Sequence, residues 1–216
     1  MLILLSPKTV FAAAPEIKEV ETSILNPTDS QANTLLKSKP TYFKEDAPLA
    51  TVGVVPYTLK DGEVWILLGR ETEDKTWSDF GGKVNKEDES FAAALKREYI
   101  EETAGAGVLT DEQLKANHTF YFYIHKPGKR QILYVFCLVA YQPESSFLEA
   151  VNKANTEETK EKDQFKWFSL EDFLSFQIKD LEGYPLRKFF RQDVVNSSEF
   201  TQIIQRLKEK KLRKAA

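Results

Sequence analysis

The sequence predicts a layered α/β or α+β domain, and three observations support this prediction. Of the 216 residues, 42% are apolar and 29% are charged, which is typical of a globular protein rather than a disordered or fibrous one. Several short segments rich in β-branched and aromatic residues are separated by turn residues, as strands are. An Ala-rich helical segment lies among them. Strands before and after a central helix favour helices packed on a sheet.

The predicted strands have both the composition and the flanking turns that strands require. Residues 50–59 are rich in Val, Thr and Tyr, and the turn signal Asp61-Gly62 separates them from residues 64–69. Residues 131–141 are almost continuously apolar, which predicts a strand buried on both faces. The remaining strands are expected at residues 118–125 and 165–169.

The predicted helices have recognisable starts and stops. Residues 90–103 follow the acidic residues 87–89 and end at Gly105, a common helix terminator. Residues 201–214 carry an apolar stripe followed by basic side chains, which suit the C-terminal end of the helix dipole. Shorter helices are expected at residues 170–176 and 187–190. Residues 142–164 are polar and are expected to form a long connection.

The two ends of the chain differ from the middle. Residues 1–14 resemble either part of a signal peptide or a disordered N-terminus, so the protein is expected to be cytoplasmic or exported. Residues 15–48 contain four prolines and predict an arm or linker, with one short helical turn at 32–37. The main domain is expected at residues 49–182, followed by a C-terminal helical extension at 183–216.

The composition excludes several classes of function. Thirty Lys and Arg residues against 33 Asp and Glu residues give a net charge of −3, so non-specific DNA binding is not expected. No apolar run is long enough to span a bilayer, so no membrane association is expected. The one cysteine, Cys137, excludes an internal disulfide and a cysteine-based zinc site, and its apolar surroundings predict a core residue.

Three carboxylates gather on one side of the central helix. At 100° per residue, Glu98, Glu101 and Glu102 fall within about a third of the helix circumference. Glu98 and Glu102 repel each other as an i,i+4 pair, whereas Arg97 and Glu101 attract. Carboxylates that converge beside a buried stripe suit Mg²⁺, which prefers oxygen ligands. A solvent-exposed acidic face is the alternative.

The residues before this helix complete a longer pattern. Gly81-Gly82-Lys83, then Glu89, then the run Arg-Glu-Tyr-Ile-Glu-Glu at residues 97–102 resemble the Nudix box. Glu89 stands at the spacing from Arg97 that the box requires, but six residues rather than five separate it from Gly82. Asp88 stands at the right spacing from Gly82, with eight rather than seven residues before Arg97. We favour Glu89.

A second departure lies at the end of the helix, where Ala104 replaces the glycine of the box and Gly105 follows. The resemblance implies an α/β/α sandwich with a mixed sheet. It also implies metal-dependent hydrolysis, with Mg²⁺ or Mn²⁺, of the pyrophosphate linkage in a nucleoside diphosphate joined to another moiety. ADP-ribose, dinucleoside polyphosphates, nucleotide sugars and nucleoside triphosphates are all candidate substrates.

The resemblance also assigns roles to residues. Glu98, Glu101, Glu102 and the Gly81 carbonyl would hold the metals, and Arg97 would pair with Glu89 to keep the acids in place. The general base would be an acid of the box or one of the later residues Glu157, Glu158 and Glu161.

Substrate contacts are expected from the residues that flank the box. Gly82 permits close approach of a ligand to the backbone, and Arg70 and Lys83 could meet phosphate oxygens. A strand-end arginine and a solvated loop lysine are the alternatives for the last two. A catalytically inactive module that binds nucleotide or a protein partner is the alternative function. A homodimer is possible for a family of this kind.

Overall fold

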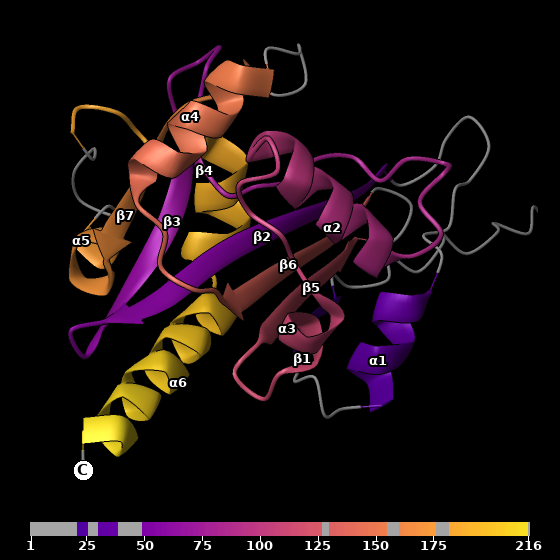
Figure 1. The fold of residues 1–216 in the computed structure, drawn as a ribbon. Coiled ribbons are helices and arrows are strands. Elements are labelled where there is room, and N and C mark those ends of the chain that lie inside the picture. Colours follow the sequence, from indigo (N-terminus) through magenta and orange to yellow (C-terminus); the bar gives the residue numbers. More distant parts are fainter. Residues whose placement is uncertain are drawn as a thin grey trace, which may run out of the picture.

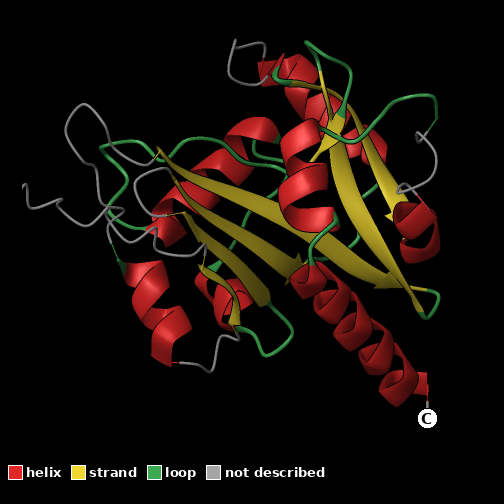
Figure 2. Ribbon diagram, turned by 180° about the vertical axis from the view of Figure 1, so that it is seen from behind, coloured by secondary structure: helices red, strands yellow, loops and turns green. Residues whose placement is uncertain are grey.

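A mixed β-sheet with helices on both faces forms the centre of the protein (Figures 1 and 2). The structure is a computed structural model that describes residues 21–25, 30–38, 49–126, 130–154, 160–175 and 182–215. The predicted α/β sandwich with a mixed sheet is confirmed. Residues 1–14, for which a signal peptide was considered, lie outside the described residues.

The sheet has seven strands, six of them in the order β1-β5-β6-β2-β3-β4, and β7 pairs with the other edge of β3. Strands β2 and β6 run parallel, and the other named pairs are antiparallel. The strands are β1 (Glu21–Leu25), β2 (Leu49–Lys60), β3 (Glu63–Glu71), β4 (Trp77–Ser78), β5 (Phe120–Lys126), β6 (Arg130–Leu138) and β7 (Lys162–Ser169).

The helices form a layer on each face of the sheet. One layer holds α1 (Ser30–Lys37), α2 (Phe91–Glu102), α3 (Asp111–Lys115) and α4 (Glu144–Ala154). The other holds α5 (Leu170–Ser175), the π-helix η2 (Phe190–Val195) and α6 (Ser198–Ala215).

Strand β6 lies between two hydrophobic cores, as its continuous apolar sequence predicts. Its side chains alternate between the cores because successive residues of a strand point to opposite faces. Ile132, Tyr134 and Phe136 belong to the core under α5, η2 and α6, whereas Leu133, Val135 and Cys137 belong to the core under α1 to α4. Cys137 is fully buried, and the prediction of a core residue is confirmed.

Two helices, α3 and α4, are not among the helices expected from the sequence. Helix α4 lies within residues 142–164, so the predicted long connection is wrong. Its buried Phe147 and Val151 stand four residues apart on one helical face, and the Phe147 ring stacks 5.2 Å from that of Phe165. The short α3 begins with a capping box in which Thr110 and Gln113 satisfy each other's backbone N–H groups.

Both extensions contribute to the main domain. The helical turn predicted at residues 32–37 is confirmed as α1, which packs on α2, and β1 adds an edge strand beside β5. At the other end α6 includes the predicted residues 201–214 and starts three residues earlier, where the Ser197 hydroxyl accepts a hydrogen bond from Phe200 N. The short helix predicted at 187–190 is replaced by η2. These C-terminal elements supply much of the core on their face of the sheet.

The segment after β4 continues along β2 as an irregular strand. Val54 and Phe80 exchange backbone hydrogen bonds of 2.7 and 3.0 Å, and Val52 N donates to Gly82 O at 3.0 Å. This pairing fixes the two adjacent glycines at the sheet. A Cβ on Gly81 would clash with the Val52 carbonyl oxygen, so the close approach of the two backbones requires glycine there.

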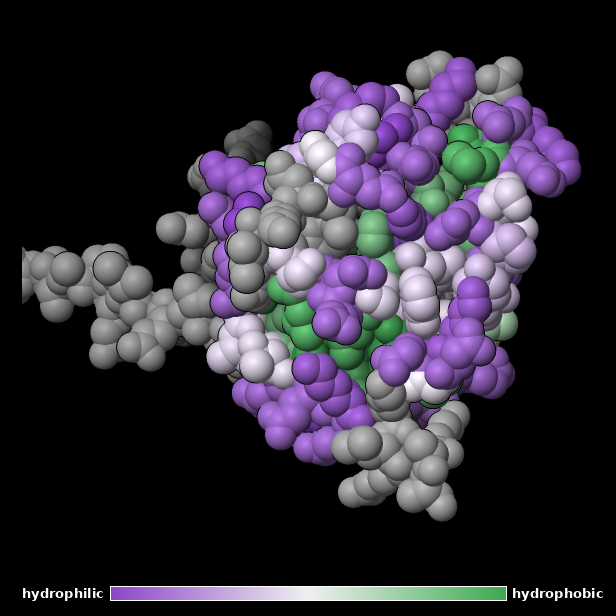
Figure 3. Space-filling model, turned by 90° about the vertical axis from the view of Figure 1, so that its left-hand side faces the viewer, coloured by the Kyte–Doolittle hydropathy of each residue, from purple (hydrophilic) through white to green (hydrophobic). Residues whose placement is uncertain are grey.

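The face at the left of Figure 1 shows hydrophilic residues around a smaller hydrophobic patch (Figure 3). Within the described ranges, none of the helices has the length and apolar character to cross a bilayer.

Candidate active site

Helix α2 presents two carboxylates on its buried face. The helix begins at Ser90, whose hydroxyl accepts a hydrogen bond from Ala93 N at 3.1 Å, and this cap fixes the helical register. Glu98 and Glu102, one turn apart, are 8% and 2% exposed. The helix ends at Glu102, and Ala104 adopts the left-handed conformation that the box reserves for glycine (φ 50°). The alanine is accommodated at this position at a cost of about 1 kcal/mol.

The Gly81-Gly82 segment meets both carboxylates. Gly81 N donates to Glu102 Oε2 at 3.1 Å, and a Cβ on Gly82 would lie 2.7 Å from Glu98 Oε2. The two glycines therefore let the backbone pass between β2 and the acidic face of α2. This arrangement places the two carboxylates against the irregular strand, as the spacing of the motif predicts.

Arg97 pairs with Asp88 rather than with Glu89. Its Nε donates to Asp88 Oδ1 at 3.0 Å and its Nη2 to Asp88 Oδ2 at 2.9 Å, while Lys83 O accepts from Nη2 at 3.0 Å. Asp88 is buried and Glu89 is exposed. The predicted Arg97–Glu89 pairing is therefore wrong. Asn85 N donates to Asp88 Oδ2 at 2.7 Å, which turns the shorter aspartate toward the guanidinium.

The third predicted metal ligand, Glu101, shares the guanidinium of Arg97 with Glu98 and is more exposed than the other two. Arg97 Nη1 lies 2.8 Å from both Glu98 Oε1 and Glu101 Oε2, and the Glu101 side chain is 39% exposed. The structure thus brings Glu98 and Glu102 to the glycine segment, and Arg97 links Glu101 to Glu98. In the described part of the chain, no three His, Cys, Asp or Glu side chains are grouped so as to hold a metal ion.

Glu98 and Glu102 nevertheless suit a divalent cation. Burial raises the pKa of Glu98 to about 7, although Arg97 opposes the rise. Burial likewise raises the pKa of Glu102 well above its usual range, against the charge of Lys162. Two buried carboxylates whose charged forms are disfavoured gain most from an added cation. Their oxygen chemistry is the type that Mg²⁺ and Mn²⁺ accept.

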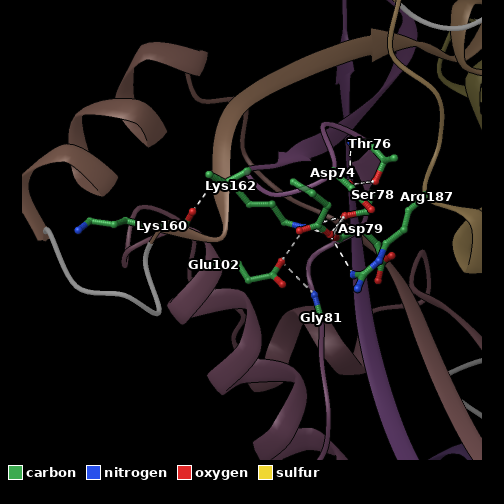
Figure 4. Close-up of polar contacts among 11 residues, drawn as sticks. Asp74, Thr76, Ser78, Asp79, Gly81, Glu102, Lys160, Lys162 and Arg187 are labelled. Carbon is green, nitrogen blue, oxygen red and sulfur yellow. Dashed lines mark hydrogen bonds and ion pairs between the residues drawn. The ribbon is translucent and has the colours of Figure 1, made fainter.

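A buried lysine that sequence reasoning missed completes this polar cluster. Lys162 extends from the start of β7 toward Glu102 and the Gly81 backbone, whereas Lys160 points away (Figure 4). The Lys162 Nζ lies 2.7 Å from Glu71 Oε1, 2.6 Å from Ser78 Oγ and 3.4 Å from Glu102 Oε2. Glu71, on β3, also accepts a hydrogen bond from Arg187 at 2.9 Å.

A cavity of about 820 Å³ opens beside this cluster. Gly81 and Gly82 form part of its wall, and Glu71 and Asp79 supply acidic groups. Burial raises the pKa of Asp79 to about 6, although Lys162 and Arg187 oppose the rise. The remaining wall includes Lys83, Tyr134, Lys160, Glu161, Arg187 and the exposed ring of Phe189. The volume lies in the range of cavities that bind small-molecule ligands.

The predicted substrate-binding residues separate into two groups. Gly82 and Lys83 line the cavity. Arg70 is engaged elsewhere: its Nε donates to Asp163 at 2.7 Å, and its guanidinium lies 4.5 Å from the centre of the Tyr184 ring. We therefore leave Arg70 out of the candidate site. Of the acids considered as general base, Glu161 lines the cavity, and Glu157 and Glu158 lie outside the described residues.

The chain matches known proteins mainly through one domain. A family model described as the NUDIX domain matches residues 47–191. A curated relative, the uncharacterized protein L534 of Acanthamoeba polyphaga mimivirus, is 39% identical over 59 residues, which cover 25% of this chain. The matched region spans 19% of that relative's length.

The solved structures that match the chain are distant in sequence. The MutT/nudix family protein from Enterococcus faecalis is 20% identical, with 61% of this chain and 46% of that chain covered and a TM-score of 0.41. An Ap4A hydrolase from C. elegans is 16% identical (74% and 96% covered, TM-score 0.42). The NUDIX domain of Shewanella oneidensis NrtR, solved with ADP ribose, is 20% identical (84% and 99% covered, TM-score 0.43).

Proposed function

Because the chain belongs to the Nudix family, we propose that it hydrolyses the pyrophosphate linkage of a nucleoside diphosphate joined to another moiety, with Mg²⁺ or Mn²⁺ as cofactor. One observation carries the proposal. Helix α2 places the buried Glu98 and Glu102 against the Gly81-Gly82 segment, which forms a wall of the 820 Å³ cavity. A pyrophosphate held in the cavity would lie beside carboxylates suited to a divalent cation.

In this proposal the charged residues of α2 have different roles. Glu98 and Glu102 would hold the metal, with Glu101 and the Gly81 carbonyl as further oxygen ligands. When bound, the metal neutralises phosphate charge and lowers the pKa of a water molecule. Arg97 keeps Glu98 and Glu101 in position through Nη1, and its own position is fixed by Asp88.

The cavity wall supplies the groups that a nucleotide needs. Lys83 and Arg187 are cationic and can meet phosphate oxygens, and the exposed Phe189 ring offers a surface on which a base can stack. Glu161 lies on the same wall and would accept a proton from an attacking water. ADP-ribose, a dinucleoside polyphosphate, a nucleotide sugar and a nucleoside triphosphate all contain the required linkage.

Turnover on a substrate panel tests this proposal. Release of phosphate-containing products is measured for each substrate class with Mg²⁺ or Mn²⁺, and with EDTA as a metal-free control. Glu102→Gln should abolish turnover while the fold is retained. Glu149→Gln, an exposed acid on α4 that pairs with Lys153, is the matched control and should keep full activity. Retained turnover in Glu102→Gln would contradict the metal-site assignment.

A binding module without catalytic activity is the second candidate. The observation that favours it is the contact of Lys162 with Glu102, which commits a predicted metal ligand to an internal cation. Calorimetry with Mg²⁺ and the same nucleotides separates the two functions. Binding of a nucleotide without cleavage, by folded protein, would favour the module, whereas metal-dependent cleavage would exclude it.

A further inference from the structure

Lys162 is a charged side chain with no solvent exposure at the centre of the candidate site. Its ammonium group contacts three acceptors that come from three different elements: Glu71 at the end of β3, Ser78 on β4 and Glu102 at the end of α2. The contact with Glu102 is the longest of the three, 3.4 Å against 2.7 and 2.6 Å. Lys162 thus links the metal-binding helix to the sheet, and the link to the helix is its weakest.

The fold makes specific room for this side chain. On β3, Gly69 pairs with Phe165 of β7, and a Cβ on Gly69 would lie 2.8 Å from Lys162 Cδ. The Nζ also lies 5.9 Å from the centre of the Phe80 ring, within reach of a cation–π contact. Burying an ammonium group is costly unless it is paired and hydrogen-bonded. The glycine, the ring and the three acceptors together provide that compensation.

The carboxylates around Lys162 favour its charged form. Burial alone would lower its pKa, but the carboxylates of Glu102 and Glu71 outweigh burial and raise the pKa. The ammonium group of Lys162 therefore stands 3.4 Å from one of the two carboxylates that the proposed function gives to a metal ion.

We propose that Lys162 competes with the divalent metal for Glu102, so that this lysine sets how tightly the site binds metal. The inference rests on the proposed function, because it takes Glu102 as a metal ligand. A metal ion and an ammonium group that share one carboxylate repel each other. When the metal takes Glu102, Lys162 gives up its longest contact and keeps Glu71 and Ser78. It can therefore stay buried, and the sheet and helix can remain in place with or without metal.

Direct measurement of Mn²⁺ binding tests the proposal without substrate. Lys162→Met removes the charge at similar length, and Lys162→Gln removes it while keeping a polar end. Both should bind Mn²⁺ about tenfold or more tightly than the unaltered protein, as measured by calorimetry or by the free-Mn²⁺ paramagnetic resonance signal. Lys166→Met, on the same strand but partnered with Glu182, is the control and should leave the affinity unchanged.

Thermal unfolding supplies a second readout. In EDTA the Lys162 variants should unfold at lower temperature, because Glu71 and Glu102 lose their buried counter-charge. Added Mn²⁺ should raise their unfolding temperature by more than it raises that of the unaltered protein. A variant that folds only with Mn²⁺ would also support the proposal, since the metal then replaces the ammonium group.

Three outcomes separate the two proposals. Unchanged or weaker Mn²⁺ affinity in folded Lys162→Met and Lys162→Gln, with the unaltered protein binding Mn²⁺, would overturn the role of Lys162 alone. Variants that stay unfolded with and without Mn²⁺ would also overturn it, because a metal then cannot replace the lysine. No Mn²⁺ binding by any of the proteins would remove the metal site itself, and with it the proposed hydrolysis.

Discussion

The pairing of Arg97 with Asp88 predicts that two adjacent acids differ sharply in their effect on stability. Asp88→Asn should destabilise the protein, whereas Glu89→Gln should leave the free energy of unfolding nearly unchanged. Asp88 is buried and accepts hydrogen bonds from Arg97 Nε, Arg97 Nη2 and Asn85 N at 3.0, 2.9 and 2.7 Å. Glu89, one residue later, is exposed.

The magnitude follows from what an asparagine can replace. The asparagine amide keeps one acceptor oxygen. Its NH₂ group, however, takes the place of the second Asp88 carboxylate oxygen and faces donors that this oxygen satisfies in the unaltered protein. A hydrogen bond to a charged group contributes about 1.5–3 kcal/mol. Because the Arg97 side chain is 23% exposed and keeps Glu98 and Glu101 as partners, we expect a loss of about 2 kcal/mol. Glu89→Gln should stay within about 0.5 kcal/mol, as is usual for exposed positions.

Urea unfolding of the metal-free protein measures both variants. The urea concentration at the unfolding midpoint should fall for Asp88→Asn, while the dependence of the free energy on urea concentration stays the same. The midpoint of Glu89→Gln should equal that of the unaltered protein. An equal or larger loss in Glu89→Gln would refute the observed pairing and restore the alignment that the sequence favoured.

The same pair has a predictable dependence on pH. Burial would raise the pKa of Asp88, but the hydrogen bonds from Arg97 and Asn85 N outweigh burial and lower the pKa below its usual value. A lowered pKa contributes stability above the unfolded-state value, about 3.9, and this stability is lost as the pH falls through the folded-state value. The difference between the unaltered protein and Asp88→Asn should therefore shrink below about pH 4.

Two further substitutions test the walls of the cavity. Gly81→Ala should lower the free energy of unfolding, measured in urea, by about 1–3 kcal/mol and should abolish turnover, because the new Cβ would clash with the Val52 carbonyl oxygen and displace the segment that contacts Glu102. Near-normal stability of this variant would mean that the segment is not tightly held. Phe189→Ala should raise KM about fivefold or more for a nucleotide substrate and leave kcat and stability nearly unchanged, because Phe189 is 57% exposed and lines the cavity. An unaltered KM would exclude stacking of the substrate on this ring.

The sequence predicted the parts of the site that depend on local order. Residues four apart on a helix share a face, so the convergence of Glu98 and Glu102 follows from spacing alone. A role for the two glycines before this helix could also be predicted, because glycine allows a backbone segment to approach its neighbours closely. The choice between Asp88 and Glu89 does not follow from spacing, because it depends on a turn in which Asn85 N orients Asp88. Counting residues favoured the acid that the folded loop leaves exposed.

Lys162 could not be predicted because its surroundings come from distant parts of the chain. In the sequence it stands at the end of a polar stretch, where a lysine is normally solvated. Its burial requires Gly69 on β3, Ser78 on β4 and Glu102 on α2 to meet at one point. Helix α4 differs, because the spacing of Phe147 and Val151 is present in the sequence, but the polar residues on both sides of this short apolar segment favoured a connection.

The acids of α2 are balanced by two internal cations that belong to different layers of the fold. Arg97, on the helix itself, pairs with Glu98 and Glu101, and the loop residue Asp88 holds it in position. Lys162, from the sheet, serves Glu102. Each cation compensates a carboxylate that would otherwise be repelled by its neighbour one turn away. The protein can therefore assemble its acidic face without metal, and under the proposal for Lys162 a metal ion at Glu102 would compete with this lysine for the carboxylate.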